Sequence, residues 1–165
     1  MADWPQALVL PHGAVTITPH SLHSIGAATG SLGNPGSSAW PAADRAIYIP
    51  FRIAQPILVV KMFMINGATV NGNVDLGIYD PAGVRLVSMG STAQAGASAL
   101  QTFDITDTQI GPGLFYMALA IDNTTATTIR ESDSSGVDLA VFGCAQEASA
   151  FPLPATATFA AISSG

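Results

Sequence analysis

The sequence predicts an all-β protein, an antiparallel β-sandwich or jelly roll of about eight strands with an extended N-terminal arm. Between residues 46 and 121, short apolar runs are separated by turn dipeptides such as Asn66-Gly67 and Asn71-Gly72. The 165 residues include 11 prolines and 16 glycines, spread throughout the chain. No apolar pattern with the period of a long helix is present.

Residues 1–45 are expected to form the arm. They contain short apolar pieces at residues 7–10 and 14–17, and a Gly/Ser-rich stretch at residues 26–40. Trp4 and Trp40 are candidate anchors on a neighbouring protein, because aromatic side chains bury a large area. The alternative is that both cap the chain's own sandwich. This division predicts that a chain without residues 1–40 still folds.

The sandwich is expected to span residues 46–143. Residues 46–53 alternate in polarity, and Pro50 places this strand at an edge or at a bulge because proline cannot donate to a ladder. Residues 57–65 are apolar on both faces, which predicts a central strand covered by the core on one side and by a partner or the arm on the other. Residues 74–79 predict a strand buried on one face, paired with residues 84–89.

The second half continues in the same way. A small-residue loop at residues 91–99 precedes a strand at 100–105, and another strand is expected at 114–122. Residues 125–131 and 136–143 would complete the sheets. Residues 144–165 are expected to form a C-terminal tail, whose run at 155–162 could pair as a last strand with an exposed edge of its own or a neighbouring chain.

Charge and hydropathy indicate a covered surface. Only 10% of the residues are charged, against roughly 25% in ordinary domains, and 48% are hydrophobic. Copies of the chain or a partner are expected to cover part of it, although small polar residues also solvate a monomer. The net charge of −6, with five scattered basic residues, argues against nucleic acid and anionic membranes. The N-terminus lacks a signal-peptide pattern, so the chain is expected to be soluble when made.

The sequence offers no catalytic or cofactor-binding constellation, so a non-enzyme is expected. Cys144 follows an apolar run without a basic neighbour in sequence, which is typical of a buried thiol. His12, His20 and His23 lie in the arm, and the pair His20-x-x-His23 lacks further ligands. The role of these histidines stays open.

Acidic residues lie mostly at expected turns, where aspartate is favoured for backbone hydrogen bonding. Asp104, Asp107, Asp122 and Asp133 could supply oxygen ligands to calcium, although no EF-hand pattern is present. No metal site is assigned. Whether calcium binds stays open.

Two tyrosines complete the candidate partner-binding residues. Tyr48 and Tyr79 alternate with the expected core residues of their strands, so their rings could be exposed. Interface contacts are favoured over stacking on sugars because interfaces are enriched in tyrosine. With Trp4 and Trp40, they form the predicted partner-binding set.

Two motifs carry a family resemblance, N-G-x-V-x-L-G-I-Y-D-x-x-G at residues 71–83 and G-P-G-L-F-Y-x-A-L-A at residues 111–120. With the small-residue loop between them, the stretch of residues 45–122 resembles a β-sandwich of tailed-bacteriophage structural proteins. Such domains serve as capsid decoration (cement) proteins, head fibres or tail adhesins, commonly as trimers, and have no catalytic motif.

The resemblance implies a non-enzymatic virion protein that is assembled in the host cytoplasm. A capsid decoration protein fits best, because the chain has no coiled coil and no repetitive shaft. Its expected partners are the major capsid protein or another virion protein, and two further copies in a homotrimer. The alternative is a carbohydrate-binding tail or host-adhesion module, with Trp40, Tyr79 and loop acids at its site; a hydrolase is a more distant third hypothesis.

Overall fold

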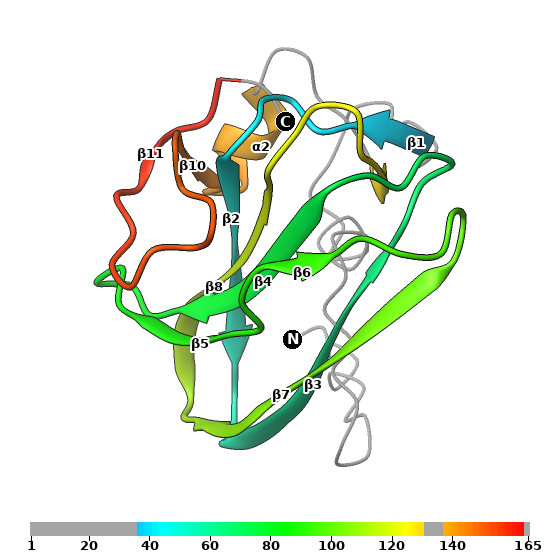
Figure 1. Ribbon diagram of the computed structural model, residues 1–165. Helices are drawn as coiled ribbons and strands as arrows, with labels where there is room; N and C mark the ends of the chain where they lie inside the picture. The colour runs from blue at the N-terminus through cyan, green and yellow to red at the C-terminus, as the bar shows by residue number, and fades with distance from the viewer. Residues whose placement is uncertain (1–35, 131–136, 164–165) are drawn as a thin grey trace, which may run out of the picture.

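A computed structural model describes residues 36–130 and 137–163 (Figure 1). The predicted positions Trp4, His12, His20, His23 and Asp133 lie outside these described residues. The described chain is an antiparallel β-sandwich, which confirms the predicted fold class. Its elements are β1 (Gly36–Ala39), β2 (Arg45–Ile53), β3 (Ile57–Ile65), β4 (Asn73–Tyr79), β5 (Arg85–Ser88), β6 (Thr92–Ala93), β7 (Leu100–Ile110), β8 (Gly113–Ile121), β9 (Thr127–Arg130), α2 (Val137–Val141), β10 (Ala145–Glu147) and β11 (Ala160–Ala161).

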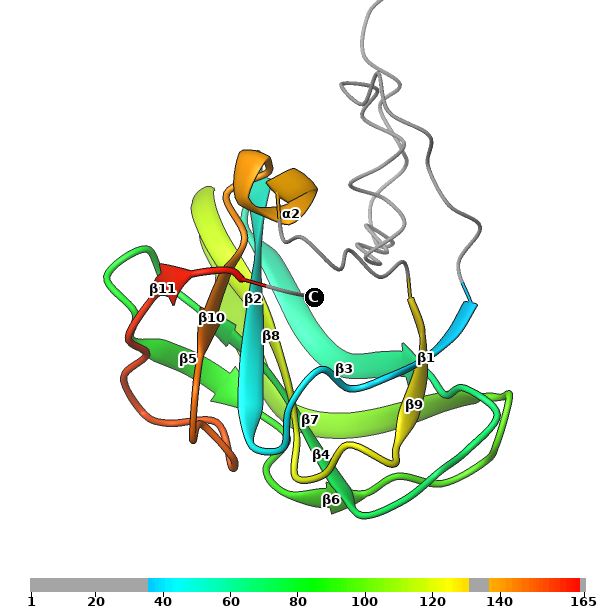
Figure 2. The same cartoon turned by 90° about the horizontal axis from the view of Figure 1, so that it is seen from above.

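Seven strands form the larger sheet, in the order β11-β10-β2-β8-β4-β5, with β6 paired to β4. Strands β3 and β7 form a separate two-stranded antiparallel sheet, which we call the ribbon. Strands β1 and β9 form a third, also of two strands. Figures 1 and 2 both show β3 and β7 side by side as a layer apart from β2, β8 and β4. The ribbon therefore faces the larger sheet across the core.

The main core lies between these two layers. Val74, Leu76 and Ile78 of β4 are at most 7% exposed, and they share one apolar cluster with Met62 and Phe103 of the ribbon. Burying each such side chain contributes about 1.5–3 kcal/mol to folding. This cluster joins the ribbon to the larger sheet, because the ribbon's inward side chains pack in it against those of β4.

A second apolar cluster covers the other face of the larger sheet. Tyr48 of β2 and Tyr79 of β4 pack there with Leu153 and Phe159 of the C-terminal segment. In Figure 1 this segment, drawn in orange and red, runs past β2 and β5. The prediction that β4 is buried on one face only is therefore wrong, because the chain's own end covers the second face.

The strand predicted at residues 136–143 is replaced by the short helix α2. Gly143 has a φ of 78°, a left-handed conformation that suits glycine, and its N–H donates to the Ala140 carbonyl at 2.9 Å. The Cys144 N–H donates to the Leu139 carbonyl at 2.9 Å. Leu139 and Phe142 pack against the main core. Their spacing of three residues fits one helical turn. In a run this short, the apolar pattern alone does not distinguish a helix from a strand.

The sandwich also begins earlier than its predicted boundary at residue 46. Strand β1 pairs with β9, and Trp40 is only 3% exposed within the main core. Deleting residues 1–40 would remove both, so a truncation that tests the arm must stop before Gly36. At the other end β10 pairs with β2 and β11 pairs with β10, so the tail completes an edge of its own chain.

Pro50 lies in the half of β2 that has a single neighbour. Strand β8 pairs along the whole of β2, whereas β10 pairs only with Ala46–Tyr48. The proline therefore sits where β2 is locally an edge, as its missing N–H predicts.

Candidate interaction surface

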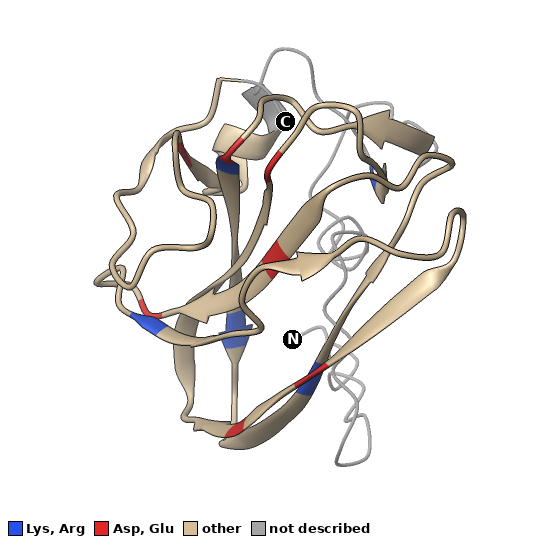
Figure 3. Cartoon of the chain, viewed as in Figure 1, with Lys and Arg blue, Asp and Glu red and all other residues tan. Residues whose placement is uncertain are grey.

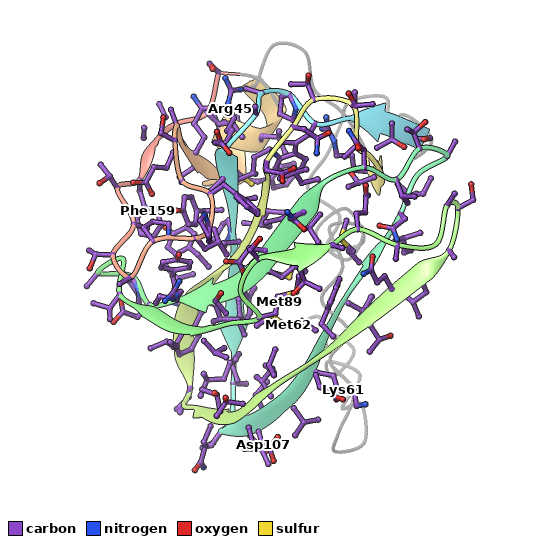
Figure 4. All side chains as sticks on the ribbon, in the orientation of Figure 1. Arg45, Lys61, Met62, Met89, Asp107 and Phe159 are labelled. Carbon is purple, nitrogen blue, oxygen red and sulfur yellow. The ribbon has the colours of Figure 1, made fainter. Side chains whose placement is uncertain are left out.

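The outer face of the ribbon exposes apolar side chains. Met62 and Met64 of β3 point into the core and are 8% and 7% exposed, so the residues that alternate with them point outward. The irregularity in the ladder between Val59 and Lys61 shifts this alternation by one residue, so Leu58 and Val60 point outward as well. Leu58 and Val60 are 58% and 43% exposed, and Leu100 of β7 is 61% exposed. Phe63 and Ile65 are half-buried on the same outer face. Figure 4 shows the difference of direction at Met62 and Lys61.

Strand β3 also has an edge without a strand partner in the described part of the chain. Its ladder runs to β7 from Ile57↔Ile110 to Ile65↔Leu100, with an irregularity between Val59 and Lys61. On the opposite side, among the described residues, the next residue, Asn66, forms an isolated bridge with Thr128 of β9. Backbone N–H and C=O groups on an unpaired edge are ready to accept another strand.

Charges on the ribbon nearly cancel. Lys61 lies 2.9 Å from Asp104 across the ladder, and their side chains are 58% and 84% exposed. Figure 3 shows this pair side by side, with Asp107 further along β7. An exposed pair of this kind stabilises the fold by under about 1 kcal/mol. It leaves the outer face with little net charge to repel a partner.

An amide network fixes the end of the ribbon. Asn66 is completely buried, and its side-chain N–H groups donate to the Ala95 carbonyl at 2.6 Å and to Gln101 Oε1 at 3.0 Å. Gln94 donates to Asn66 Oδ1 at 3.0 Å and to the Thr127 carbonyl at 2.9 Å. The sequence predicted Asn66 only as a turn residue. Its buried amide connects the end of β3 to β7, and Gln94 extends the network to β9.

Tyr48 and Tyr79 do not lie on the surface. Both are 0% exposed, and their rings meet edge to face at a centroid distance of 5.3 Å. The Tyr48 hydroxyl donates to Glu147 Oε2 at 2.7 Å, and the Tyr79 hydroxyl donates to the Pro154 carbonyl at 2.6 Å. Burial raises the pKa of both phenols. The expectation of exposed rings is therefore wrong: as placed, these tyrosines hold the C-terminal segment on the sheet.

Trp40 is also buried, as its alternative interpretation allowed. Its indole N–H donates to the Arg45 carbonyl at 2.8 Å, and the Arg130 guanidinium lies 5.6 Å from the ring centroid. Burial lowers the pKa of Arg130. Trp40 therefore caps the chain's own sandwich, and no predicted partner-binding residue in the described ranges is on the surface.

A cleft of about 490 Å³ lies between β5 and β7. Among its lining residues, Asp75 is 0% exposed, but both of its oxygens already have partners. Ser88 Oγ donates to Oδ1 at 2.7 Å and the Leu153 N–H donates to Oδ2 at 3.0 Å. Desolvation by burial raises the pKa of Asp75, against the lowering effect of these hydrogen bonds. This carboxylate holds the C-terminal segment in place.

The aspartates that could have bound calcium do not lie together in the described chain. Asp104 pairs with Lys61, whereas Asp122 accepts from the Asn73 N–H at 3.0 Å, in the larger sheet. Within the described ranges, no three His, Cys, Asp or Glu side chains are placed to hold a metal ion. Cys144 is buried and burial raises its pKa to about 11, so its thiol is protonated at neutral pH. No helix of the described residues is long and apolar enough to cross a membrane.

The comparisons with known proteins found no matching family model, no matching curated protein and no matching solved structure. The resemblance over residues 45–122 therefore rests on the motifs of the sequence itself.

Proposed function

We propose that this protein is a non-enzymatic structural component of a virion, a decoration protein that binds and stabilises a phage shell. The observation that carries this is the outer face of the ribbon, where Leu58, Val60 and Leu100 are exposed beside an unpaired strand edge. Apolar side chains gathered on one surface favour contact with another protein. The motifs at residues 71–83 and 111–120 supply the virion context.

The size of the ribbon fits one of many repeated contacts. Nine residues of strand at ~3.3 Å each and two strands ~4.8 Å apart give an outer face of about 300 Å². A stable pairwise interface needs about 800 Å² on each partner. A single ribbon would therefore bind weakly, and several copies joined in one oligomer would bind tightly through avidity. This is why a homo-oligomer, with a trimer expected, belongs to the proposal.

The aromatic side chains on which the glycan-binding alternative depends are buried. It depended on Trp40 and Tyr79 as stacking platforms, and these are 3% and 0% exposed. Sugar stacking needs an open aromatic face. No other observation on the described residues favours that function over shell binding.

The test begins with particles released by cells that carry the gene. The proposal predicts that mass spectrometry finds the chain in purified particles, and that labelled antibody marks it at regular positions on the head. Light scattering of the purified full chain should give a stable mass of three copies. A chain missing from the particles would refute the virion assignment, and a monomer at all concentrations would refute the oligomer.

A further inference from the structure

The loop between β3 and β4 contains both Asn-Gly dipeptides of the chain, Asn66-Gly67 and Asn71-Gly72. In such a dipeptide the backbone nitrogen of glycine can attack the side-chain amide carbon of asparagine, because glycine has no side chain to block the approach. We propose that Asn71 is a site of this spontaneous modification, which converts its amide to a carboxylate, and that the fold protects Asn66. The proposal concerns the chain itself and goes beyond the proposed function.

The reaction needs no other molecule than water. The Gly72 nitrogen forms a bond to Cγ of Asn71, and the bond from Cγ to Nδ2 breaks. Ammonia leaves with the proton of the Gly72 N–H, and a cyclic succinimide remains. Water then opens this ring at either carbonyl carbon, which yields aspartate or isoaspartate. Access of water and freedom of the asparagine side chain therefore control the rate.

The fold holds Asn66 in a position that blocks this reaction. Asn66 is 0% exposed, its Nδ2 donates to Gln101 Oε1 at 3.0 Å, and its Oδ1 accepts from Gln94 Nε2 at 3.0 Å. The Gly67 N–H donates to the Thr127 carbonyl at 2.9 Å, so the attacking nitrogen is itself held in a hydrogen bond. Reaction at Asn66 therefore requires local opening of the loop, and the population of the open state limits its rate.

Asn71 lies in a different environment, because both Asn71 and Gly72 are exposed. The side-chain Nδ2 of Asn71 donates to Asn123 Oδ1 at 3.4 Å, which is longer than an ordinary hydrogen bond. Two shorter bonds hold the backbone of Asn71: its N–H donates to Gln94 Oε1 at 2.9 Å, and its carbonyl accepts from Asn123 Nδ2 at 3.0 Å. The amide group is therefore held less firmly than the backbone and is open to water.

Modification would place a carboxylate where the structure has an amide donor. Asn123 Oδ1 cannot turn away, because it also accepts hydrogen bonds from the Thr125 and Ala126 N–H groups at 2.9 Å and 2.7 Å. A carboxylate at residue 71 would therefore bring acceptor oxygens face to face. Asp122 Oδ1, which accepts from Asn123 Nδ2 at 2.6 Å, adds a negative charge nearby. We expect the modified chain to be less stable.

Isoaspartate would have a further effect, because it adds one methylene group to the backbone. The Gly72 carbonyl accepts from the Gln94 N–H at 3.0 Å, and Gln94 Nε2 donates to Asn66 Oδ1 and to the Thr127 carbonyl. A longer backbone at residue 71 would move the Gly72 carbonyl away from Gln94. The end of the ribbon would then lose part of the amide network that joins it to β9.

Peptide mapping of the aged full-length chain by mass spectrometry tests the proposal. Trypsin cleaves after Lys61 and Arg85, so one peptide, residues 62–85, carries both sites. After incubation of the native chain in mildly alkaline buffer, we expect modification at Asn71 to be at least about tenfold faster than at Asn66. In concentrated guanidinium chloride the two sites should react at similar rates, because the fold no longer protects either. Equal rates in the native chain, or an Asn71 that stays intact while the unfolded chain reacts fully, would overturn the proposal.

A second measurement tests the expected loss of stability. Asn71→Asp mimics the aspartate product, and Gln55→Glu is the matched control, because it converts another exposed amide into a carboxylate outside this loop. Urea unfolding should show a lower midpoint for Asn71→Asp than for Gln55→Glu. Equal midpoints would contradict the conflict with Asn123. Neither measurement uses particles, so their failure is distinct from a failure to find the chain in virions.

Discussion

Strands β3 and β4 have similar apolar content and opposite environments. Every residue from Val74 to Tyr79 of β4 is buried, including the charged Asp75. Strand β3 carries eight apolar residues around Lys61 and exposes Leu58 and Val60. The sequence suggests the reverse, because β4 alternates in polarity and β3 does not. Apolar content therefore does not decide which strand is buried.

The neighbouring elements decide which of the two strands is buried. Strand β4 lies between β8 and β5 in the larger sheet, faces the ribbon on one side and lies under the C-terminal segment on the other. Strand β3 has one strand partner and one covered face within the described residues. An apolar strand that is left open in this way indicates a surface whose cover comes from elsewhere.

The largest contrast should appear when one leucine is shortened in each strand. Leu76→Ala in β4 removes a side chain that is 4% exposed and leaves a cavity, so the free energy of unfolding should fall by about 2–5 kcal/mol. Leu58→Ala in β3 should cost under about 1 kcal/mol. Urea unfolding of both variants measures the difference. Equal losses would show that Leu58 is as well packed as Leu76.

The second prediction concerns the cover over the larger sheet. Tyr48→Phe removes the buried hydrogen bond to Glu147, which should lower the free energy of unfolding by about 1–2 kcal/mol. Tyr116→Phe is the matched control, because Tyr116 is a half-buried tyrosine whose ring packs against Phe159 in the same apolar cluster. The control should lose under about 0.5 kcal/mol. A Tyr48→Phe variant as stable as the control would mean that Glu147 does not hold the segment.

The third prediction uses the pH dependence of β4. Burial raises the pKa of Asp75, so protonation of this carboxyl favours the folded state. The stability that protonation contributes is present below the usual pKa of aspartate and is lost as pH rises through the raised value. Urea unfolding from pH 4 to pH 7 should show a smaller decline for Asp75→Asn than for the unaltered chain. Parallel declines would contradict a buried, destabilised charge at this position.

The smallest effect is expected on the ribbon's ion pair. Asp104→Asn breaks the exposed contact with Lys61, and the free energy of unfolding should change by under about 0.5 kcal/mol. The change should shrink further in 0.5 M salt, at a screening length of about 4 Å. A loss above about 1 kcal/mol, insensitive to salt, would show that the ribbon's outer face is buried in the free chain more deeply than its exposure indicates.

Much of the fold was predictable because local patterns carry it. The bounds of β3 agree with the predicted range, and β2, β4, β5 and β8 lie within a residue or so of theirs. The helix α2 was not predictable, since a five-residue apolar run suits either class. The sequence also did not show that the C-terminal segment covers the second face of the larger sheet. Nothing near Tyr48 in the chain shows that Glu147, 99 residues away, accepts its hydroxyl hydrogen bond.

The candidate site was predicted only in outline. The two-faced pattern of residues 57–65 predicted a central strand covered on its second face by a partner or the arm. The prediction of a central strand is wrong within the described residues, because β7 is the one strand paired along β3, and the outer face of β3 is exposed. The aromatic residues chosen as partner contacts were the wrong signal in the described chain, because tyrosine and tryptophan serve a core as well as an interface. The exposed aliphatic residues Leu58, Val60 and Leu100 could have been found only from strand pairing.

One binding measurement tests the central claim, that the ribbon is the surface that binds the shell. Two double variants each replace one leucine and one valine with threonine. One is Leu58→Thr with Val60→Thr on β3, and the control is Val84→Thr with Leu86→Thr at β5, whose side chains are also exposed, at 47% and 37%. Each is added back to particles from which the chain has been stripped. We predict at least tenfold weaker binding for the β3 pair, with the β5 pair binding like the unaltered chain. Equal binding by both variants would contradict the claim.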